Sequence, residues 1–108
     1  MPMSTHVLDT ASGRPAAGIA VTAAVRKGDA WVVMGKSATD AAGRVADLLA
    51  GEPLEAATYR ITFATGAYLG PDAFYPEVVV TVRVASPDEH HHIPLLLAPH
   101  GYTTYRGS

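Results

Sequence analysis

Short runs of alternating apolar and polar residues, each ended by turn residues, restrict the folds open to this chain more than any other feature. In residues 19–26 every second position is apolar: Ile19, Val21, Ala23 and Val25. Residues 59–64 alternate in the same way, and residues 78–84 carry valine at every second position. Because successive side chains point to opposite faces of a strand, these runs indicate strands with one buried face. About seven such runs separated by turns favour a β-sandwich or a small barrel.

Helix is expected in only two short segments. Residues 65–70 can form one helical turn, limited by Gly70 and Pro71, and residues 46–50 are the other candidate. The chain has 108 residues, which is the ordinary size of one domain. We therefore predict an all-β fold in a single domain that spans residues 1–108.

Composition excludes several classes of protein. The formal net charge is −2 and there is no basic stretch, which argues against nucleic-acid binding. Cysteine is absent, so disulfides, thiol catalysis and thiolate metal sites are excluded. No apolar run approaches the ~20 residues of a membrane span, and residues 1–4 do not resemble the start of a signal peptide. We expect a cytoplasmic protein with no membrane contact; a periplasmic location would require a leader that has already been removed.

A histidine cluster followed by an apolar strand occupies residues 90–97, which read HHHIPLLL. On a strand, His91 shares the core face with the apolar side chains, whereas His90 and His92 point to the opposite face. Pro94 has no backbone N–H, so we expect the strand to lie at a sheet edge or to be interrupted there.

The outward-facing histidines allow three interpretations. Histidine titrates near neutral pH, which suits it to act as a general base. His90 and His92, joined by His6 or His100, could instead bind zinc or copper, because both metals accept imidazole ligands. Histidines at the start of a strand can also simply be solvated. The nearest carboxylates in the sequence are confined to the preceding turn, which weakens the metal interpretation.

The end of the chain is unusual because residues 102–108, YTTYRGS, continue a strand-like run, expected over residues 102–106, almost to the last residue. Chain ends are usually frayed and polar. We expect this segment to be tied down and to bring a hydroxyl, a guanidinium and the terminal carboxylate to a site; a solvated edge strand is the alternative.

Two further polar residues would each be unremarkable alone. His6 is next to the core-facing Val7, and Arg44 lies in a loop after Gly43.

Four blocks together resemble the 5-hydroxyisourate hydrolases, the enzyme branch of the transthyretin-like proteins. They are residues 5–9 (THVLD), 43–44 (GR), 92–97 (HIPLLL) and 105–108 (YRGS). The hormone-carrier branch differs at the terminal tetrapeptide and lacks the corresponding histidines. The resemblance implies a sandwich of two four-stranded antiparallel sheets with one short helix. It also implies a homotetramer, a dimer of dimers, with active sites in the channel between the dimers.

The resemblance further implies catalytic roles for His6, Arg44, His92 and Ser108. It places Tyr105 in the substrate pocket, where His6 and Arg44 would also bind substrate. Two other positions depart from the family's pattern: aromatic residues are common where this chain has His91 and His100.

The family's reaction adds water to a ring carbonyl of 5-hydroxyisourate and breaks the ring carbon–nitrogen bond. The product is 2-oxo-4-hydroxy-4-carboxy-5-ureidoimidazoline, a step of urate degradation. His92, alone or with His6, is expected to take a proton from water, Arg44 to orient the substrate and stabilise charge, and Ser108 to orient a histidine. No cofactor and no metal is expected. A small-ligand carrier and a metal-binding protein remain as alternatives.

Overall fold

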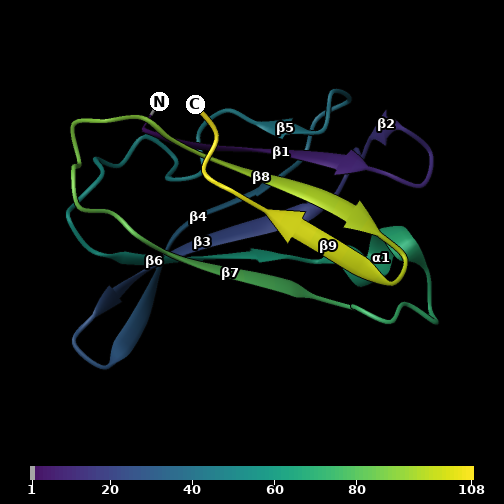
Figure 1. Ribbon diagram of the computed structural model, residues 1–108. Helices are drawn as coiled ribbons and strands as arrows, with labels where there is room; N and C mark the ends of the chain where they lie inside the picture. The colour runs from purple at the N-terminus through teal and green to yellow at the C-terminus, as the bar shows by residue number, and fades with distance from the viewer. Residues whose placement is uncertain (1) are drawn as a thin grey trace.

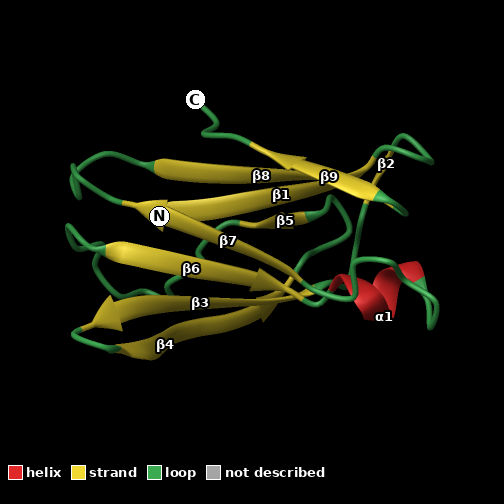
Figure 2. Ribbon diagram, turned by 60° about the horizontal axis from the view of Figure 1, so that its bottom comes forward, coloured by secondary structure: helices red, strands yellow, loops and turns green. Residues whose placement is uncertain are grey.

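The computed structural model describes residues 2–108 and shows a sandwich of two sheets. Sheet A has five strands: β1 (Met3–Asp9), β2 (Arg14–Pro15), β5 (Arg44–Val45), β8 (His91–Ala98) and β9 (Gly101–Thr104). Sheet B has four: β3 (Ala20–Lys27), β4 (Ala30–Ala38), β6 (Thr58–Phe63) and β7 (Val78–Arg83). A short helix, α1 (Thr65–Leu69), follows β6. Figures 1 and 2 show the two layers, with α1 at the end of the sandwich where β8 finishes.

The predicted all-β sandwich with one short helix is confirmed, but sheet A differs from prediction in two respects. β1 and β8 pair in parallel, from Met3↔His91 to Asp9↔Leu97. The two-residue strands β2 and β5 each pair antiparallel with a different part of β1, so the sheet has five strands rather than four. Sheet B is antiparallel with the order β4-β3-β6-β7. Because all of sheet B lies between β1 and β8 in the chain, no tight hairpin dictates their relative direction.

The predicted alternation decides which face of each strand is buried. Ile19, Val21, Ala23 and Val25 are at most 1% exposed, and the β1 side chains alternate between buried and half-buried. His91 is buried among the apolar residues of β8, as predicted. The largest core side chains, Tyr59 and Phe63, are fully buried. Burial of an apolar side chain of this kind contributes about 1.5–3 kcal/mol, so the inner faces hold the sheets together.

The helix predicted within residues 65–70 is confirmed, whereas the one predicted at residues 46–50 is wrong. Residues 46–51 instead form turns, in which the Asp47 carboxylate accepts hydrogen bonds from the backbone N–H groups of Leu49 and Gly51. Such side-chain bonds compete with helix formation. Ala50 and Gly51 then adopt positive φ angles of 53° and 86°, which end any helical path. No helix in residues 2–108 is long and apolar enough to cross a membrane.

The edge position expected for the strand with Pro94 is wrong, because β8 lies between β1 and β9. The interruption is present on one side only. The β9 ladder ends at Leu95↔Thr104, and the Thr104 hydroxyl donates to the Pro94 carbonyl at 2.8 Å. In a β-strand, the N–H and C=O of one residue point toward the same neighbouring strand. An N–H at residue 94 would therefore point toward β9, at the position where β9 ends. Strand β9 also ends earlier than the run to Arg106 that the sequence suggested.

Candidate functional site

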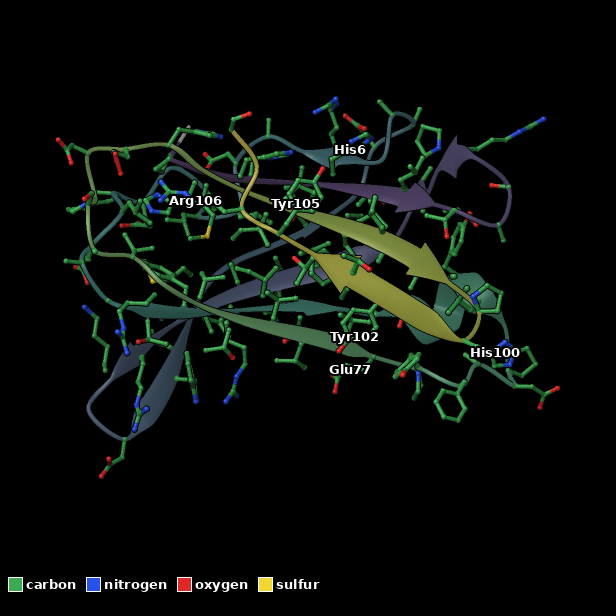
Figure 3. The ribbon with its side chains drawn as sticks, viewed as in Figure 1. His6, Glu77, His100, Tyr102, Tyr105 and Arg106 are labelled. Atoms are coloured by element: carbon green, nitrogen blue, oxygen red, sulfur yellow. The ribbon has the colours of Figure 1, made fainter. Side chains whose placement is uncertain are left out.

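The outer face of sheet A gathers the predicted site residues from separate parts of the chain. His6 on β1 lies opposite Arg44 on β5, and Ser4 on β1 lies beside His92 on β8. The alternation along β1 turns Ser4 and His6 away from the core. Figure 3 shows His6 close to β5. The parallel β1–β8 pairing therefore assembles polar groups on one surface that no short-range sequence pattern connects.

A turn organised by Asp40 places Arg44. The Asp40 carboxylate accepts hydrogen bonds from the backbone N–H groups of Ala42 and Arg44, each at 2.9 Å. Gly43 has a φ of 74°, and its carbonyl accepts a hydrogen bond from Val7 of β1 at 2.7 Å. A Cβ at Gly43 would approach the Val7 carbonyl oxygen to 2.5 Å, so glycine is needed there. Sequence reasoning missed Asp40, although an Asp three residues before a Gly is a typical turn signal.

His92 is half-buried and is held from two sides. Its Nδ1 lies 2.8 Å from the Ser4 hydroxyl oxygen, which in turn lies 2.9 Å from Nε2 of His90. On the other side, a Cβ built on Gly107 would lie 2.5 Å from the His92 ring carbon Cδ2, so the C-terminal backbone packs directly on the imidazole. The sequence singled out His90 and the terminal segment but did not indicate that Ser4 would join the cluster.

Burial lowers the pKa of His92 from its ordinary value of 6.5, because it penalises the charged form of the imidazole. The charges of Arg44, His90 and His6 lower the pKa of His92 further. The side chain is therefore biased toward the neutral form at neutral pH, and a neutral imidazole can accept a proton.

A hollow of about 490 Å³ brings Arg44, His92 and Ser108 together. Ser4, Asp40 and His90 also contribute to its walls, and His6 lies next to it, opposite Arg44. These residues come from β1, from β5 and the turn before it, from the start of β8 and the residue before it, and from the last residue of the sequence. The hollow thus combines imidazole, guanidinium and hydroxyl groups.

Tyr105 lies in a different hollow, of about 340 Å³, between β7 and the C-terminal segment. His92 lines both hollows, so it lies between the hollow that contains Tyr105 and the hollow that contains Arg44. Tyr105 is 54% exposed, which leaves most of its ring available to a further contact. In Figure 3 Tyr105 and Arg106 follow β9, while His100 lies at the far end of that strand. There the His100 ring is 6.1 Å from that of Phe74, away from the other site residues.

The expectation that the chain end is tied down is confirmed. The Gly107 N–H donates to the His92 carbonyl at 2.8 Å and forms an isolated bridge with β8. Arg106 forms an ion pair of 3.4 Å with Glu89, in which both side chains are exposed. Since exposed ion pairs contribute little, the backbone bridge is the stronger restraint on the segment. Ser108 is thereby kept close to His92.

The metal interpretation finds no ligand set in the part of the chain that the structure describes. Within residues 2–108, no group of three or more His, Asp or Glu side chains is placed to hold a metal ion. His90 and His92 stack with ring centroids 6.5 Å apart, and a serine hydroxyl lies between their nitrogens. The arrangement instead offers a proton acceptor, a cation and hydrogen-bond donors around one hollow.

Comparison with known proteins gives consistent matches along nearly the whole chain. A sequence model of the HIUase/Transthyretin family matches residues 3–107. The 5-hydroxyisourate hydrolase of Caulobacter vibrioides is 42% identical over 113 residues, which cover 98% of this chain and 97% of that protein.

Solved structures agree with the sequence matches. The 5-hydroxyisourate hydrolase of Klebsiella pneumoniae gives a TM-score of 0.85 at 32% identity, covering 98% of this chain and 97% of that one. Sea bream transthyretin in complex with thyroxine gives a TM-score of 0.87 at 29% identity, covering 99% of this chain and 95% of that one. Because both the sequence and the fold match from one end to the other, this chain belongs to the HIUase/transthyretin family.

Proposed function

We propose that this protein hydrolyses 5-hydroxyisourate to 2-oxo-4-hydroxy-4-carboxy-5-ureidoimidazoline in urate degradation. The observation that carries the proposal is the convergence of Arg44, His92 and Ser108 on one hollow, with His6 beside it. Relatives that bear the name 5-hydroxyisourate hydrolase match 98% of the chain, which supports the same reaction.

His92 is the proposed general base. A water oxygen attacks the ring carbonyl carbon of the substrate while His92 takes one of the water's protons. The lowered pKa of His92, caused first by burial, favours the neutral form that this step requires. The ring carbon–nitrogen bond then breaks, and the proton passes from His92 to the leaving nitrogen. His6 shares in orienting the water.

Arg44 is proposed to orient the substrate and to stabilise the negative charge that develops on the attacked oxygen. A guanidinium presents several N–H donors in one plane, which matches a planar, oxygen-rich ring. Its backbone is fixed by the Asp40 turn and by the β1 pairing, which sets the point at which the side chain leaves the sheet. Donors held where negative charge develops stabilise a transition state most effectively.

Ser108 and Tyr105 are proposed to complete the site. Ser108, through its hydroxyl or its carboxylate, would orient an imidazole of the cluster, as an acidic group does in a catalytic triad. Tyr105 would cover one side of the substrate from the neighbouring hollow, with His92 between the two. No step of this scheme needs a metal, so we propose metal-independent hydrolysis of a cyclic amide.

We further propose a homotetramer, built as a dimer of dimers, in which sites lie between subunits. The hollow on sheet A faces outward, so a second subunit could cover it and exclude water. Analytical ultracentrifugation would test this, with an expected mass four times the 11.3 kDa of the chain. A monomer with full activity would overturn the proposal that the sites need a second subunit.

The direct test follows the ultraviolet absorbance of freshly generated 5-hydroxyisourate with and without the protein, using His92→Ala as the negative control. Faster decay with the wild-type protein alone is expected, and it should survive dialysis against a chelator. Decay at the buffer rate would contradict the function.

The match to transthyretin suggests a competing function as a small-ligand carrier, because that solved relative is in complex with thyroxine. Saturable thyroxine binding without hydrolysis would therefore favour a carrier, and activity restored by zinc or copper would favour a metal site.

A further inference from the structure

The Ser4 hydroxyl lies between two imidazole nitrogens on the outer face of sheet A. It is 2.8 Å from Nδ1 of His92 and 2.9 Å from Nε2 of His90. We propose that Ser4 is a positioning residue that holds neutral His92 with its proton on Nδ1, and that His90 accepts a hydrogen bond from the Ser4 hydroxyl. This inference rests on the proposed function, since it states how His92 is made ready to act as a base.

The hydrogen-bond inventory limits the arrangements open to this cluster. A hydroxyl has one proton to donate, and a neutral imidazole has one N–H donor and one acceptor nitrogen. If Ser4 donates to His90, it must accept from His92, which then carries its proton on Nδ1 and has a lone pair on Nε2. If Ser4 donates to His92 instead, the proton of His92 lies on Nε2 and that nitrogen can only act as an acid. The direction of the Ser4 hydrogen bond therefore selects the role of His92.

Two features of the fold make Ser4 suited to this task. The parallel register places Ser4 directly beside His92, and Ser4 is half-buried on a strand rather than in a mobile loop. Gly107 confines the opposite edge of the His92 ring, so the imidazole cannot turn away from Ser4 without meeting the C-terminal backbone. The ring is thereby held with Nδ1 on Ser4, and Nε2 is the nitrogen left to meet water or substrate.

His90 contributes by accepting the hydrogen bond that the Ser4 hydroxyl donates. It is the exposed residue just before β8, and its ring stacks at 24° to that of His92. Without His90, the Ser4 hydroxyl could turn its proton toward His92 and stabilise the wrong tautomer. The same fixing of a tautomer by a second hydrogen-bond partner accounts for large rate effects in catalytic triads.

The experiment measures the tautomer and the kinetics separately. Long-range ¹H–¹⁵N spectra of labelled protein distinguish Nδ1–H from Nε2–H imidazoles without any substrate. In the wild type, His92 is expected as the Nδ1–H tautomer; in Ser4→Ala it should move toward Nε2–H, the form favoured in water. Ser4→Thr keeps the hydroxyl and should restore the wild-type spectrum. Ser12→Ala, in the exposed turn at the other end of β1, is the matched control.

The kinetic expectation is a loss in kcat of roughly tenfold to 100-fold for Ser4→Ala with KM little changed, because the residue acts through His92. His90→Ala should lose less. An unchanged His92 tautomer in Ser4→Ala, or an unchanged kcat, would overturn the inference. If the wild type fails to hydrolyse 5-hydroxyisourate but the tautomer still depends on Ser4, the hydrogen-bond link stands and the proposed function fails.

Discussion

The outer faces of the two sheets are built on the same strand alternation, yet they carry different chemistry. On sheet A, Arg44 and His92 line one hollow from two strands, and His6 lies next to it on a third. On sheet B, Arg60 packs over Trp31, with its guanidinium carbon 4.0 Å from the ring centroid. Both faces offer an arginine, but only sheet A places it beside histidines and the chain end.

The comparison shows that residue type alone does not identify the functional face. The Arg60 cation is engaged with an aromatic ring, which stabilises a surface by about 0.5–1 kcal/mol when exposed. The Arg44 cation instead lowers the pKa of a neighbouring histidine. A site arises where the fold lets charged groups act on one another, and the following predictions test that distinction.

His92→Ala should have the largest effect. Loss of a general base typically lowers the rate by about 10²–10⁴-fold. The side chain is half-buried on the outer face, so its removal leaves no cavity in the core and the melting temperature should change little. Turnover of 5-hydroxyisourate and thermal unfolding would be measured on the same sample. Near-normal turnover would remove His92 from the mechanism.

Arg44→Lys and Arg60→Lys compare the two faces directly. Lysine keeps the charge but loses the planar fork of donors, so Arg44→Lys should lose about 10²–10³-fold in kcat/KM if it stabilises the oxyanion. Arg60→Lys should leave kcat/KM unchanged and lower the melting temperature slightly, since it weakens the contact with Trp31. Equal activities of the two variants would show that Arg44 supplies charge alone.

Gly107→Ala tests the contact between the chain end and the His92 ring. The added Cβ would lie 2.5 Å from Cδ2 of His92, so the ring or the C-terminal segment must move and the contact between them changes. Displacement of a catalytic group by about 1 Å can cost about 100-fold in rate. Gly101→Ala is the matched control, because a Cβ there meets no atom within 4 Å. Wild-type kcat in Gly107→Ala would mean that the ring position is not critical.

The pH dependence should show the smallest effect. Burial and the Arg44 charge lower the pKa of His92 below 6.5, so the acid limb of kcat/KM should have its midpoint below that value. Arg44→Gln removes a positive charge that opposes protonation, so its residual activity should be lost at a higher pH than in the wild type. A pH profile between about pH 5 and 8 would measure both midpoints. An acid limb that moves the other way would contradict the charge coupling.

Much of the fold could be predicted because a strand's alternation is local. The period of two assigned residues 19–26 and β8 to strands, turned His91 inward, and left His6 and His92 facing outward, as the structure shows. The helix predicted at residues 46–50 is wrong because the Asp47 hydrogen bonds that compete with helix formation depend on the folded backbone.

The sequence by itself determined the strand faces, the single helical turn and the residue types of the candidate site, since these follow from short-range sterics and from chemistry. The parallel pairing of β1 with β8, which places Ser4 on His92, was decided only by the tertiary structure. So was the packing of Gly107 on the His92 ring. These contacts join residues from opposite ends of the chain, and they form only once burial of the shared core has brought those ends together.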